Sequence, residues 1–237
     1  MPSIQLPVRR SPANGRGEGG GGGVLAEEDI TKLFNSYNLP LPKQALAKTA
    51  NEAKKIAQQI GYPTIAKISS PQILHKTDIG GIRANLKNDQ EVTKAFEEIM
   101  ANAKKNAPEA DIRGVLIQQF LPVGHEFIVG IIRDPSFGPL VMVGLGGIYT
   151  ELFRDTAFRI APIEVDEAYE MLQELKAWKL LLGMRGQQQA DIDRLTQLIV
   201  SISHMAMEHP EIAELDLNPV LVSEQGIVIA DAKVILK

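Results

Sequence analysis

Three strand-forming runs follow one another in the middle of the chain with very short connections. They read VLIQQF from Val115, then HEFIVGIIRD, then GPLVMVGLGG, and proline and glycine lie in the connections between them. Short apolar runs bounded by such turn residues are typical of neighbouring β-strands. The centre of the chain is therefore expected to be a mostly antiparallel meander.

Helical patterns precede this centre. Two capping boxes, TANE from Thr49 and NDQE from Asn88, each begin a helix whose apolar residues share one face. Between the two helices lie the strand run PTIAKIS and a second strand near residues 82–86. These elements predict a first module of about ninety residues in the order α-β-β-α.

Helices and strands also follow the centre. Apolar spacing predicts helices over about 166–182 and 190–208, and two closing strands predict a hairpin around residues 224–226. The order of elements along the whole chain predicts an α+β protein. We expect two subdomains, at residues 25–112 and 113–237.

The first 24 residues have a different composition from the rest. Five consecutive glycines, residues 19–23, follow a stretch with almost no periodic apolar pattern, and so many glycines are costly to order. Residues 1–24 are therefore expected to form a flexible leader. Structure should begin near Ala26, where Ile30, Leu33 and Phe34 make one helical stripe.

Composition narrows the possible partners. Of the 237 residues, 44% are hydrophobic and 23% charged, as in globular proteins, and no apolar run approaches the roughly 20 residues of a membrane span. The net charge of −4 provides no basic field for nucleic acid or anionic lipid. The absence of cysteine excludes disulfides and thiolate metal sites. We expect a cytoplasmic protein that binds neither nucleic acid nor membrane.

A lysine and a glycine pair suggest a phosphate site. Lys67 lies in the middle of a strand among apolar residues, and Gly80 and Gly81 follow in the next loop. Glycine lets backbone N–H groups approach a phosphate, and a lysine adds positive charge. The alternative for Lys67 is a surface residue that extends its charged end into water.

His75 lies between the lysine and the glycines, in the segment ILHKTDIGGI. A neutral imidazole beside a phosphate can attack phosphorus and hold the phosphoryl group as a phosphoramidate. The alternative is an ordinary loop histidine exposed to solvent. Position in the sequence favours the nucleophile only if the neighbouring residues do bind phosphate.

The closing strands bring several oxygen side chains together. Glu214, Asp216 and Asn218 alternate onto one face of a strand, and Asp231 lies opposite them on the last strand. Carboxylate and amide oxygens suit Mg²⁺, which takes one or two protein ligands and completes its shell with water and phosphate. The alternative is a strand edge that its charges protect from aggregation.

The central strands offer a place for a base. Gln118 and Gln119 end one strand, the connector FLPVG follows, and Glu126 begins the next strand. An extended connector presents backbone groups to an adenine edge, and Glu126 can accept hydrogen bonds from ribose hydroxyls.

Taken in order, these segments resemble the ATP-grasp fold, and more narrowly the β subunit of ADP-forming acetyl-CoA (acyl-CoA) synthetases, relatives of succinyl-CoA synthetase. The resemblance covers nearly the whole chain after the leader. It rests on EAKKIAQQIGYPTIAKISSPQILHKTDIGGI, GHEFIVGIIRDPSFGPLVMVGLGGIYTELFRDTAFRIAP, LLGMRGQQQADI and EIAELDLNPVLV with GIVIADAKVIL. It implies a fold in which two α+β subdomains clamp a nucleotide.

The resemblance also implies roles for individual residues. Nucleotide contacts would come from Lys67 at the phosphates, Gln119, Phe120 and Leu121 at the adenine, and Glu126 at the ribose, and Mg²⁺ ligands from Asn218 and Asp231. His75 matches a phosphohistidine of these enzymes. Asp216 stands where succinyl-CoA synthetases carry a glutamate that steadies a phosphohistidine, and its side chain is shorter.

The activity that the resemblance implies is acyl-CoA + ADP + phosphate ⇌ carboxylic acid + ATP + CoA. A separate α subunit would bind CoA and pass a phosphoryl group to this chain in an α₂β₂ assembly, and His75 would transfer it to ADP with Mg²⁺. Two other readings stay open. One is an ATP-grasp ligase that forms an acyl phosphate without a phosphohistidine, and the other is a non-catalytic module that senses nucleotide.

Overall fold

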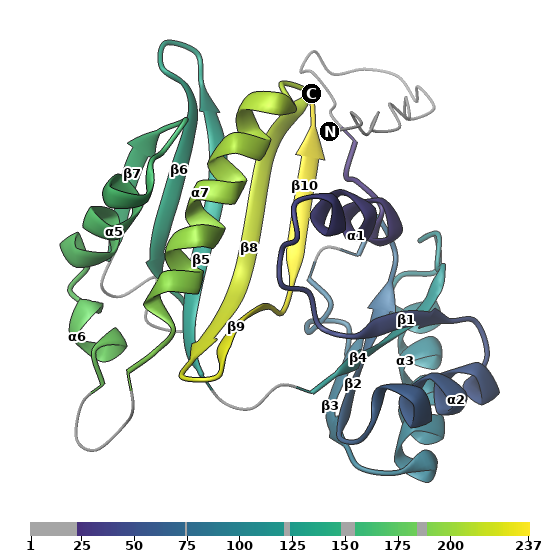
Figure 1. Cartoon of the computed structure of the whole chain (residues 1–237). Helices are drawn as coiled ribbons and strands as arrows, with labels where there is room; N and C mark the ends of the chain where they lie inside the picture. The colour runs from purple at the N-terminus through teal and green to yellow at the C-terminus, as the bar shows by residue number, and fades with distance from the viewer. Residues whose placement is uncertain (1–22, 74, 121–123, 148–154, 184–188) are drawn as a thin grey trace. The chain divides into compact units, whose positions relative to one another are not determined.

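The structure is a computed structural model that describes residues 23–73, 75–120, 124–147, 155–183 and 189–237. The expected flexible leader, residues 1–24, lies outside the described residues except for its last two. The chain divides into two compact units (Figure 1). The smaller unit is Pro42–Pro122, and the larger unit combines Met1–Leu41 with Val123–Lys237.

In the part of it that the structure describes, the smaller unit is a four-stranded antiparallel sheet with two helices. Its strand order is β1 (Gln44–Ala47), β4 (Gly114–Gln119), β2 (Thr64–Ser69) and β3 (Ile82–Leu86). Helices α2 (Ala50–Ile60) and α3 (Asp89–Asn106) pack against each other and on the sheet, where fully buried Ile68, Ile99 and Ile117 form part of the core.

The predicted N-caps of both helices in the smaller unit are confirmed, while the returning bond of each capping box comes from the residue before the cap. The Thr49 side chain accepts a hydrogen bond from the Glu52 N–H, and the Asn88 side chain accepts one from the Glu91 N–H. Glu52 and Glu91 reach back to the preceding backbone, where Lys48 and Lys87 donate their N–H groups. Local sequence therefore fixes where α2 and α3 begin.

The larger unit is built on a six-stranded antiparallel sheet. Its main strand order is β10 (Ala232–Leu236), β8 (Ile212–Ser223), β5 (His125–Asp134), β6 (Gly138–Leu145) and β7 (Thr156–Ile160), and β9 (Gly226–Ile229) pairs with β8. The predicted hairpin is confirmed, but its second half consists of two strands. Both β9 and β10 pair with the long β8, and Ala230 and Asp231 between them belong to neither strand.

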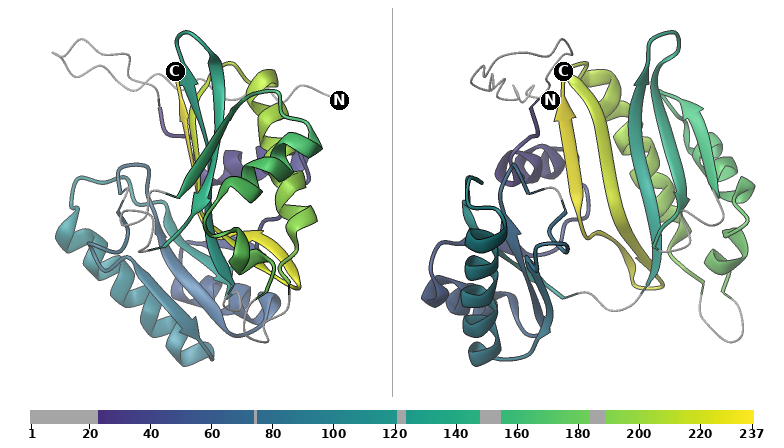
Figure 2. Two further views of the ribbon diagram at one scale, coloured as in Figure 1. Left: turned by 90° about the vertical axis from the view of Figure 1, so that its left-hand side faces the viewer. Right: turned by 180° about the vertical axis from the view of Figure 1, so that it is seen from behind.

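Among its described residues, the larger unit has four helices: α1 (Glu27–Ser36), α5 (Val165–Glu174), α6 (Trp178–Leu181) and α7 (Ile192–Glu208). Helices α5 and α7 lie over one face of its sheet, and the view from behind in Figure 2 shows the strands in front of α7. Residues from strands and helices fill this covered side, including Phe127, Ile131, Leu195 and Ile199, all fully buried. Within the described residues, no helix is long and apolar enough to cross a membrane.

One predicted helix is divided in two. The expected helix at 166–182 is interrupted at Leu175, which has the extended ψ of 136°. Buried Asp155 accounts for the break, because its carboxylate accepts hydrogen bonds from the Lys176 and Ala177 N–H groups, both at 2.8 Å. A carboxylate that takes two backbone donors competes with the helical pattern at that point.

The boundary of the units differs from the expected subdomains at 25–112 and 113–237. Helix α1 buries Ile30, Leu33 and Phe34 in the core of the larger unit. Strand β4, the first of the three central runs, pairs with β1 and β2 of the smaller unit instead of continuing the meander. Only the second and third runs are neighbours, as β5 and β6.

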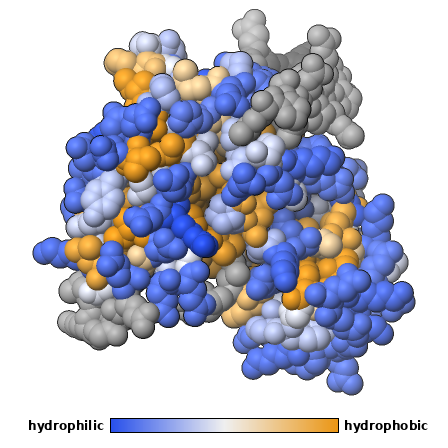
Figure 3. All heavy atoms as spheres, viewed as in Figure 1, coloured by the Kyte–Doolittle hydropathy of each residue, from blue (hydrophilic) through white to orange (hydrophobic). Residues whose placement is uncertain are grey.

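The other face of the larger sheet carries exposed apolar side chains beside the acidic ones. Cross-strand pairs place Glu214, Ile132, Leu140 and Ile160 in one row, and Ile132 and Ile160 are 48% and 51% exposed. Figure 3 views the larger unit from its helix-covered side, where apolar side chains gather at the end at which β5 turns into β6. Phe137 in that turn is 63% exposed.

Arg133 ties the end of α7 to the sheet. Its guanidinium donates to the carbonyl oxygens of Ala206, His209 and Ile212, and the hydrogen bond to His209 is 2.8 Å long. Burial lowers the pKa of Arg133, and the nearby Glu211 carboxylate opposes that shift. Carbonyls at a helix C-terminus have no partner within the helix, so this arginine satisfies groups that would otherwise lose their hydrogen bonds.

We therefore expect Arg133→Met to lower the free energy of unfolding by about 2 to 3 kcal/mol, because three charge-assisted bonds are lost. Arg159→Met is the matched control. Its ion pair with Glu174 lies at the surface, and such pairs contribute less than about 1 kcal/mol. Urea unfolding of both variants checks the difference, and equal losses would show that the helix-end contacts of Arg133 add nothing.

Candidate functional site

The candidate residues fall in both units. The smaller unit holds Lys67, His75, Gly80, Gly81, Gln119 and Phe120, and the larger unit holds Glu126, Asp216, Asn218 and Asp231. Leu121 lies outside the described residues.

Lys67 is not a surface residue of the smaller unit. It is 7% exposed, in the middle of β2, where it pairs with Leu116 on β4 and Ile82 on β3. Its neighbours Ala66 and Ile68 pack in the core beneath the helices, so alternation places Lys67 on the sheet face opposite α2 and α3. A lysine this buried does not extend its charged end into water, so the alternative of an ordinary surface lysine does not hold for Lys67.

His75 is exposed on the loop between β2 and β3. Ile73, two residues before it, is 7% exposed and belongs to the core of the smaller unit, and Ile79 after it packs against the same core. Within the described residues, the His75 ring has no hydrogen-bond partner. The loop is thus anchored on both sides of a histidine whose ring nitrogens are accessible to a reactant.

The glycine pair has a structural role within its loop. The Gly80 N–H donates to the Thr77 carbonyl at 2.9 Å, and the Gly81 N–H donates to the Lys76 carbonyl at 2.7 Å. Both N–H groups are used inside the loop and neither is available as a donor to a phosphate in this structure, so the expected role of Gly80 and Gly81 at a phosphate stays a prediction. A Cβ on Gly81 would lie 2.6 Å from Ile68 Cγ2, which shows that this glycine closes the loop tightly against β2.

The backbone expected to meet adenine is also partly engaged. The Gln119 N–H donates to the Lys43 carbonyl at 2.8 Å, and the Phe120 N–H donates to the Pro63 carbonyl at 3.1 Å. These two amides secure the end of β4 to the segments beside it. Adenine recognition by this connector would therefore need groups other than the two N–H donors.

Glu126, at the start of β5, is held by a glycine segment that sequence reasoning gave no role. The Gly146 N–H donates to the Glu126 carbonyl at 2.7 Å. A Cβ on Gly146 would lie 2.9 Å from the same carbonyl, and one on Gly147 would lie 2.8 Å from Glu126 Oε2. The run GLGG therefore leaves room for the Glu126 backbone and carboxylate, and only the glycine spacing hinted at such a close approach.

The acidic residues of β8 share one face, as predicted. Asp216 pairs with Gly130 on β5 and with Lys233 on β10, and the intervening Leu215 and Leu217 are buried on the helix-covered side. The Asn218 N–H donates to the Asp231 carbonyl at 3.1 Å. Asn218 and Asp231 are therefore neighbours at the point where the chain passes from β9 to β10.

The electrostatics of this face favour a cation. Burial raises the pKa of Asp216, Glu214 and Asp231 raise it further, and Lys233 lowers it. Three carboxylates that repel one another create a negative potential, which Lys233 partly offsets. A divalent ion would relieve this repulsion.

The donors at this place fit magnesium. Asp231 brings a carboxylate and Asn218 an amide oxygen, the hard ligands that Mg²⁺ takes from proteins. Among the described residues, no group of three or more histidine, aspartate and glutamate side chains is arranged to hold a metal ion. Two protein ligands suit an ion that shares its shell with water and phosphate oxygens.

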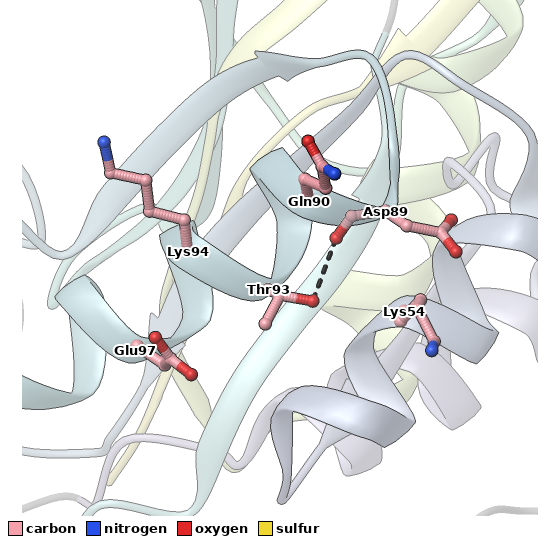
Figure 4. Close-up of a pocket in the computed structure, with 6 residues that line it drawn as sticks. All are labelled: Lys54, Asp89, Gln90, Thr93, Lys94 and Glu97. Atoms are coloured by element: carbon pink, nitrogen blue, oxygen red, sulfur yellow. Dashed lines mark hydrogen bonds between the residues drawn. The ribbon is translucent and has the colours of Figure 1, made fainter.

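A depression of about 380 Å³ elsewhere on the smaller unit has no part in this site. Lys54 of α2 and residues of the first half of α3 line it, namely Asp89, Gln90, Thr93, Lys94 and Glu97 (Figure 4). The His75 loop contacts the other end of α3, at Asn102 and Asn106. Mixed charges and no buried polar side chain mark this depression as an ordinary surface hollow between helices.

Comparison with known proteins gives the family. The family model described as the ATP-grasp domain matches residues 18–236. The β subunit of acetate–CoA ligase [ADP-forming] I from Pyrococcus furiosus is 46% identical over 212 residues, which are 90% of this chain and 91% of the relative. The chain belongs to the ATP-grasp family of ADP-forming acetate–CoA ligase β subunits. The resemblance inferred from the sequence, and with it the α+β ATP-grasp fold, is confirmed.

Other members of this acetate–CoA ligase family differ in length. Acetate–CoA ligase [ADP-forming] I from Archaeoglobus fulgidus is 43% identical over 216 residues, which are 91% of this chain but 31% of that relative. Acetyl-coenzyme A synthetase 1 of Ca. Korarchaeum cryptofilum, solved with coenzyme A and Ca-AMPCP, gives a TM-score of 0.88 at 45% identity and covers 91% of this chain and 94% of its own. A second structure of that enzyme contains Mg-AMPPCP and a phosphohistidine segment pointing towards the nucleotide-binding site.

Proposed function

We propose that this chain is the nucleotide-binding β subunit of an ADP-forming acetate–CoA ligase, an acid–thiol ligase. The reaction is acyl-CoA + ADP + phosphate ⇌ carboxylic acid + ATP + CoA. The observation that carries the proposal is the 46% identity to a β subunit of such an enzyme across nine-tenths of both chains, together with an exposed histidine on an anchored loop. A cytoplasmic location is part of this proposal.

His75 is the covalent carrier in this mechanism. A ring nitrogen attacks the phosphorus of an incoming phosphoryl group, so an N–P bond forms while the bond from phosphorus to its donor breaks. The terminal phosphate oxygen of ADP then attacks the same phosphorus and the N–P bond breaks. ATP leaves, and the His75 ring returns to a neutral imidazole. Asp216 is proposed to orient the ring by accepting from the nitrogen that does not attack.

Charge neutralisation completes the transfer. Phosphoryl transfer depends mainly on position and on stabilising the negative charge of the phosphate oxygens. Lys67 is proposed to supply one positive charge at these oxygens, and Mg²⁺ held by Asn218 and Asp231 would supply another. The nucleoside is proposed to bind to Glu126, Gln119, Phe120 and Leu121. The N–H groups of Gln119 and Phe120 take no part, because both already donate to backbone carbonyls.

Asp231→Asn tests the metal site. The variant keeps the size of the side chain and loses its charge, so the Mg²⁺ concentration for half-maximal nucleotide binding is expected to rise about tenfold. Fluorescence titration with a labelled ADP at several Mg²⁺ concentrations measures this. Glu224→Gln, in the exposed turn between β8 and β9, is the control and should leave the midpoint unchanged. An unchanged midpoint for Asp231→Asn would remove this residue from the metal site.

A second polypeptide is part of the proposed function. The Archaeoglobus fulgidus relative contains about twice the length of this chain beyond the matched part, whereas the Pyrococcus furiosus relative is a separate subunit. We propose that a CoA-binding α subunit supplies the phosphoryl group and that the two chains form an α₂β₂ assembly. Size-exclusion chromatography with light scattering, on the two co-expressed subunits, tests the assembly.

The deciding experiment locates the phosphate. The chain is incubated with Mg²⁺ and γ-labelled ATP, which runs the proposed transfer backwards from ATP to His75. An acid-labile, base-stable label on the peptide that contains His75, identified by mass spectrometry, supports the proposal. An unlabelled chain that still binds ATP would instead favour an ATP-grasp ligase without a phosphohistidine or a nucleotide-sensing module.

A further inference from the structure

The loop that carries His75 is attached to the last turns of α3 by two asparagine side chains. Asn102 Nδ2 donates to the Gly80 carbonyl at 3.1 Å, and Asn106 Nδ2 donates to the Ile79 carbonyl at 3.2 Å. Residues four apart lie on the same side of a helix, so both amides reach the loop from one face of α3. Two consecutive carbonyls of the loop are therefore held by one helix.

Arg83 reinforces the same attachment. Its Nη1 donates to the Gly80 carbonyl at 3.3 Å, and its Nε donates to Glu98 Oε2 at 3.1 Å. Glu98 lies on α3, one turn before Asn102. The Gly80 carbonyl thus accepts from two side chains, and α3 contributes to both of these contacts.

Gly80 is fitted to the contact with Asn102. Its φ of +67° is in the left-handed region, and a Cβ at this position would lie 2.8 Å from Asn102 Nδ2. A larger residue would therefore push the amide away from the carbonyl that it binds. The glycine and the asparagine are matched to each other, although 22 residues separate them in the chain.

Backbone hydrogen bonds carry this attachment to the histidine. The Gly81 N–H donates to the Lys76 carbonyl at 2.7 Å, and the Asp78 N–H donates to the His75 carbonyl at 3.3 Å. The Gly81 carbonyl in turn accepts from the Ile68 N–H of β2 at 2.8 Å. The turn is closed on itself, so a shift at Gly80 moves Lys76 and His75 as well.

We propose that Asn102 and Asn106 are positioning residues for His75, which they act on by fixing the loop to α3. The proposal rests on the proposed role of His75 as phosphoryl carrier. In-line transfer requires the attacking nitrogen close to phosphorus and aligned with the leaving bond, and a displacement of about 1 Å can slow such a reaction about 10²-fold. Neither asparagine touches the reacting atoms in this account.

The test is the rate at which the full chain transfers phosphate from γ-labelled ATP to His75 with Mg²⁺ present. The double variant Asn102→Ala/Asn106→Ala is expected to be labelled about tenfold more slowly or worse, since Arg83 still holds the Gly80 carbonyl. The dissociation constant of ATP should stay unchanged. Lys105→Ala, an exposed substitution on the same helix, is the control and should label at the wild-type rate.

A second pair of variants separates hydrogen bonding from packing. Asn102→Asp/Asn106→Asp keeps the shape of both side chains but replaces each amide donor with an acceptor that faces a carbonyl. Labelling as slow as in the alanine variant, or slower, supports the positioning role. The Gly80 and Gly81 amides should also exchange hydrogen faster than in the wild type. Wild-type labelling in either double variant would overturn it. If the wild-type chain itself takes no label, the proposed function fails, and this role fails with it.

Discussion

Replacing His75 with asparagine is expected to abolish phosphoryl transfer while nucleotide binding persists. Loss of a covalent nucleophile removes a whole reaction step, and such losses lower kcat by about 10⁴-fold or more. The side chain is exposed and makes no hydrogen bond within the described residues, so the fold should not depend on it. Surface substitutions of this kind change stability by less than about 0.5 kcal/mol. Turnover with the partner subunit, ATP affinity and thermal unfolding are measured side by side.

His204→Asn is the matched control for this experiment. His204 is also exposed, but it lies on α7 of the larger unit, the helix that covers the sheet face opposite the acidic residues. Its variant should keep full turnover. Substantial acetyl-CoA synthesis by the His75 variant would defeat the covalent route and favour a ligase that forms its acyl phosphate directly.

Local sequence signals predicted most individual elements of the fold. The capping residues Thr49 and Asn88 placed the starts of α2 and α3 because a cap acts within one helical turn. The boundary between the units could not be read in this way. Helix α1 and strand β4 each join elements that are distant in the chain, and only the pairing of β4 with β2 and the burial of Phe34 decide where they belong.

The residues of the candidate site likewise divide into those that local sequence predicted and those that it did not. Alternation along one strand predicted the shared face of Asp216 and Asn218, because side chains in a strand alternate with a period of two residues. The contacts of Gly80 and Gly81 could not be predicted in this way, because a glycine permits a close approach but does not indicate which group approaches. The contact of Gly80 with Asn102 depends on how the loop packs on α3, and no spacing in the sequence indicates it.

Asp216→Asn is expected to make the protein more stable and less active. Burial raises the pKa of Asp216, and Glu214 and Asp231 raise it further against the effect of Lys233. A carboxyl whose pKa is higher in the folded state binds its proton more tightly there, so the folded protein loses stability as the pH rises from the ordinary carboxyl pKa through the raised one. At neutral pH the charged side chain therefore opposes folding, and the neutral asparagine removes that opposition.

Unfolding is measured with EDTA present, so that no metal ion compensates the carboxylates. The midpoint of thermal unfolding should be higher for Asp216→Asn than for wild type at pH 7, and the difference should shrink as both proteins are taken to acid pH, where Asp216 is neutral. If Asp216 orients His75 as proposed, transfer from ATP to His75 should fall about 10²-fold, because a neutral amide is a weaker hydrogen-bond acceptor than a carboxylate. Glu224→Gln, in an exposed turn, should change neither quantity. A variant that is less stable and fully active would mean that Asp216 serves the fold, since a residue kept for chemistry is retained at the expense of stability.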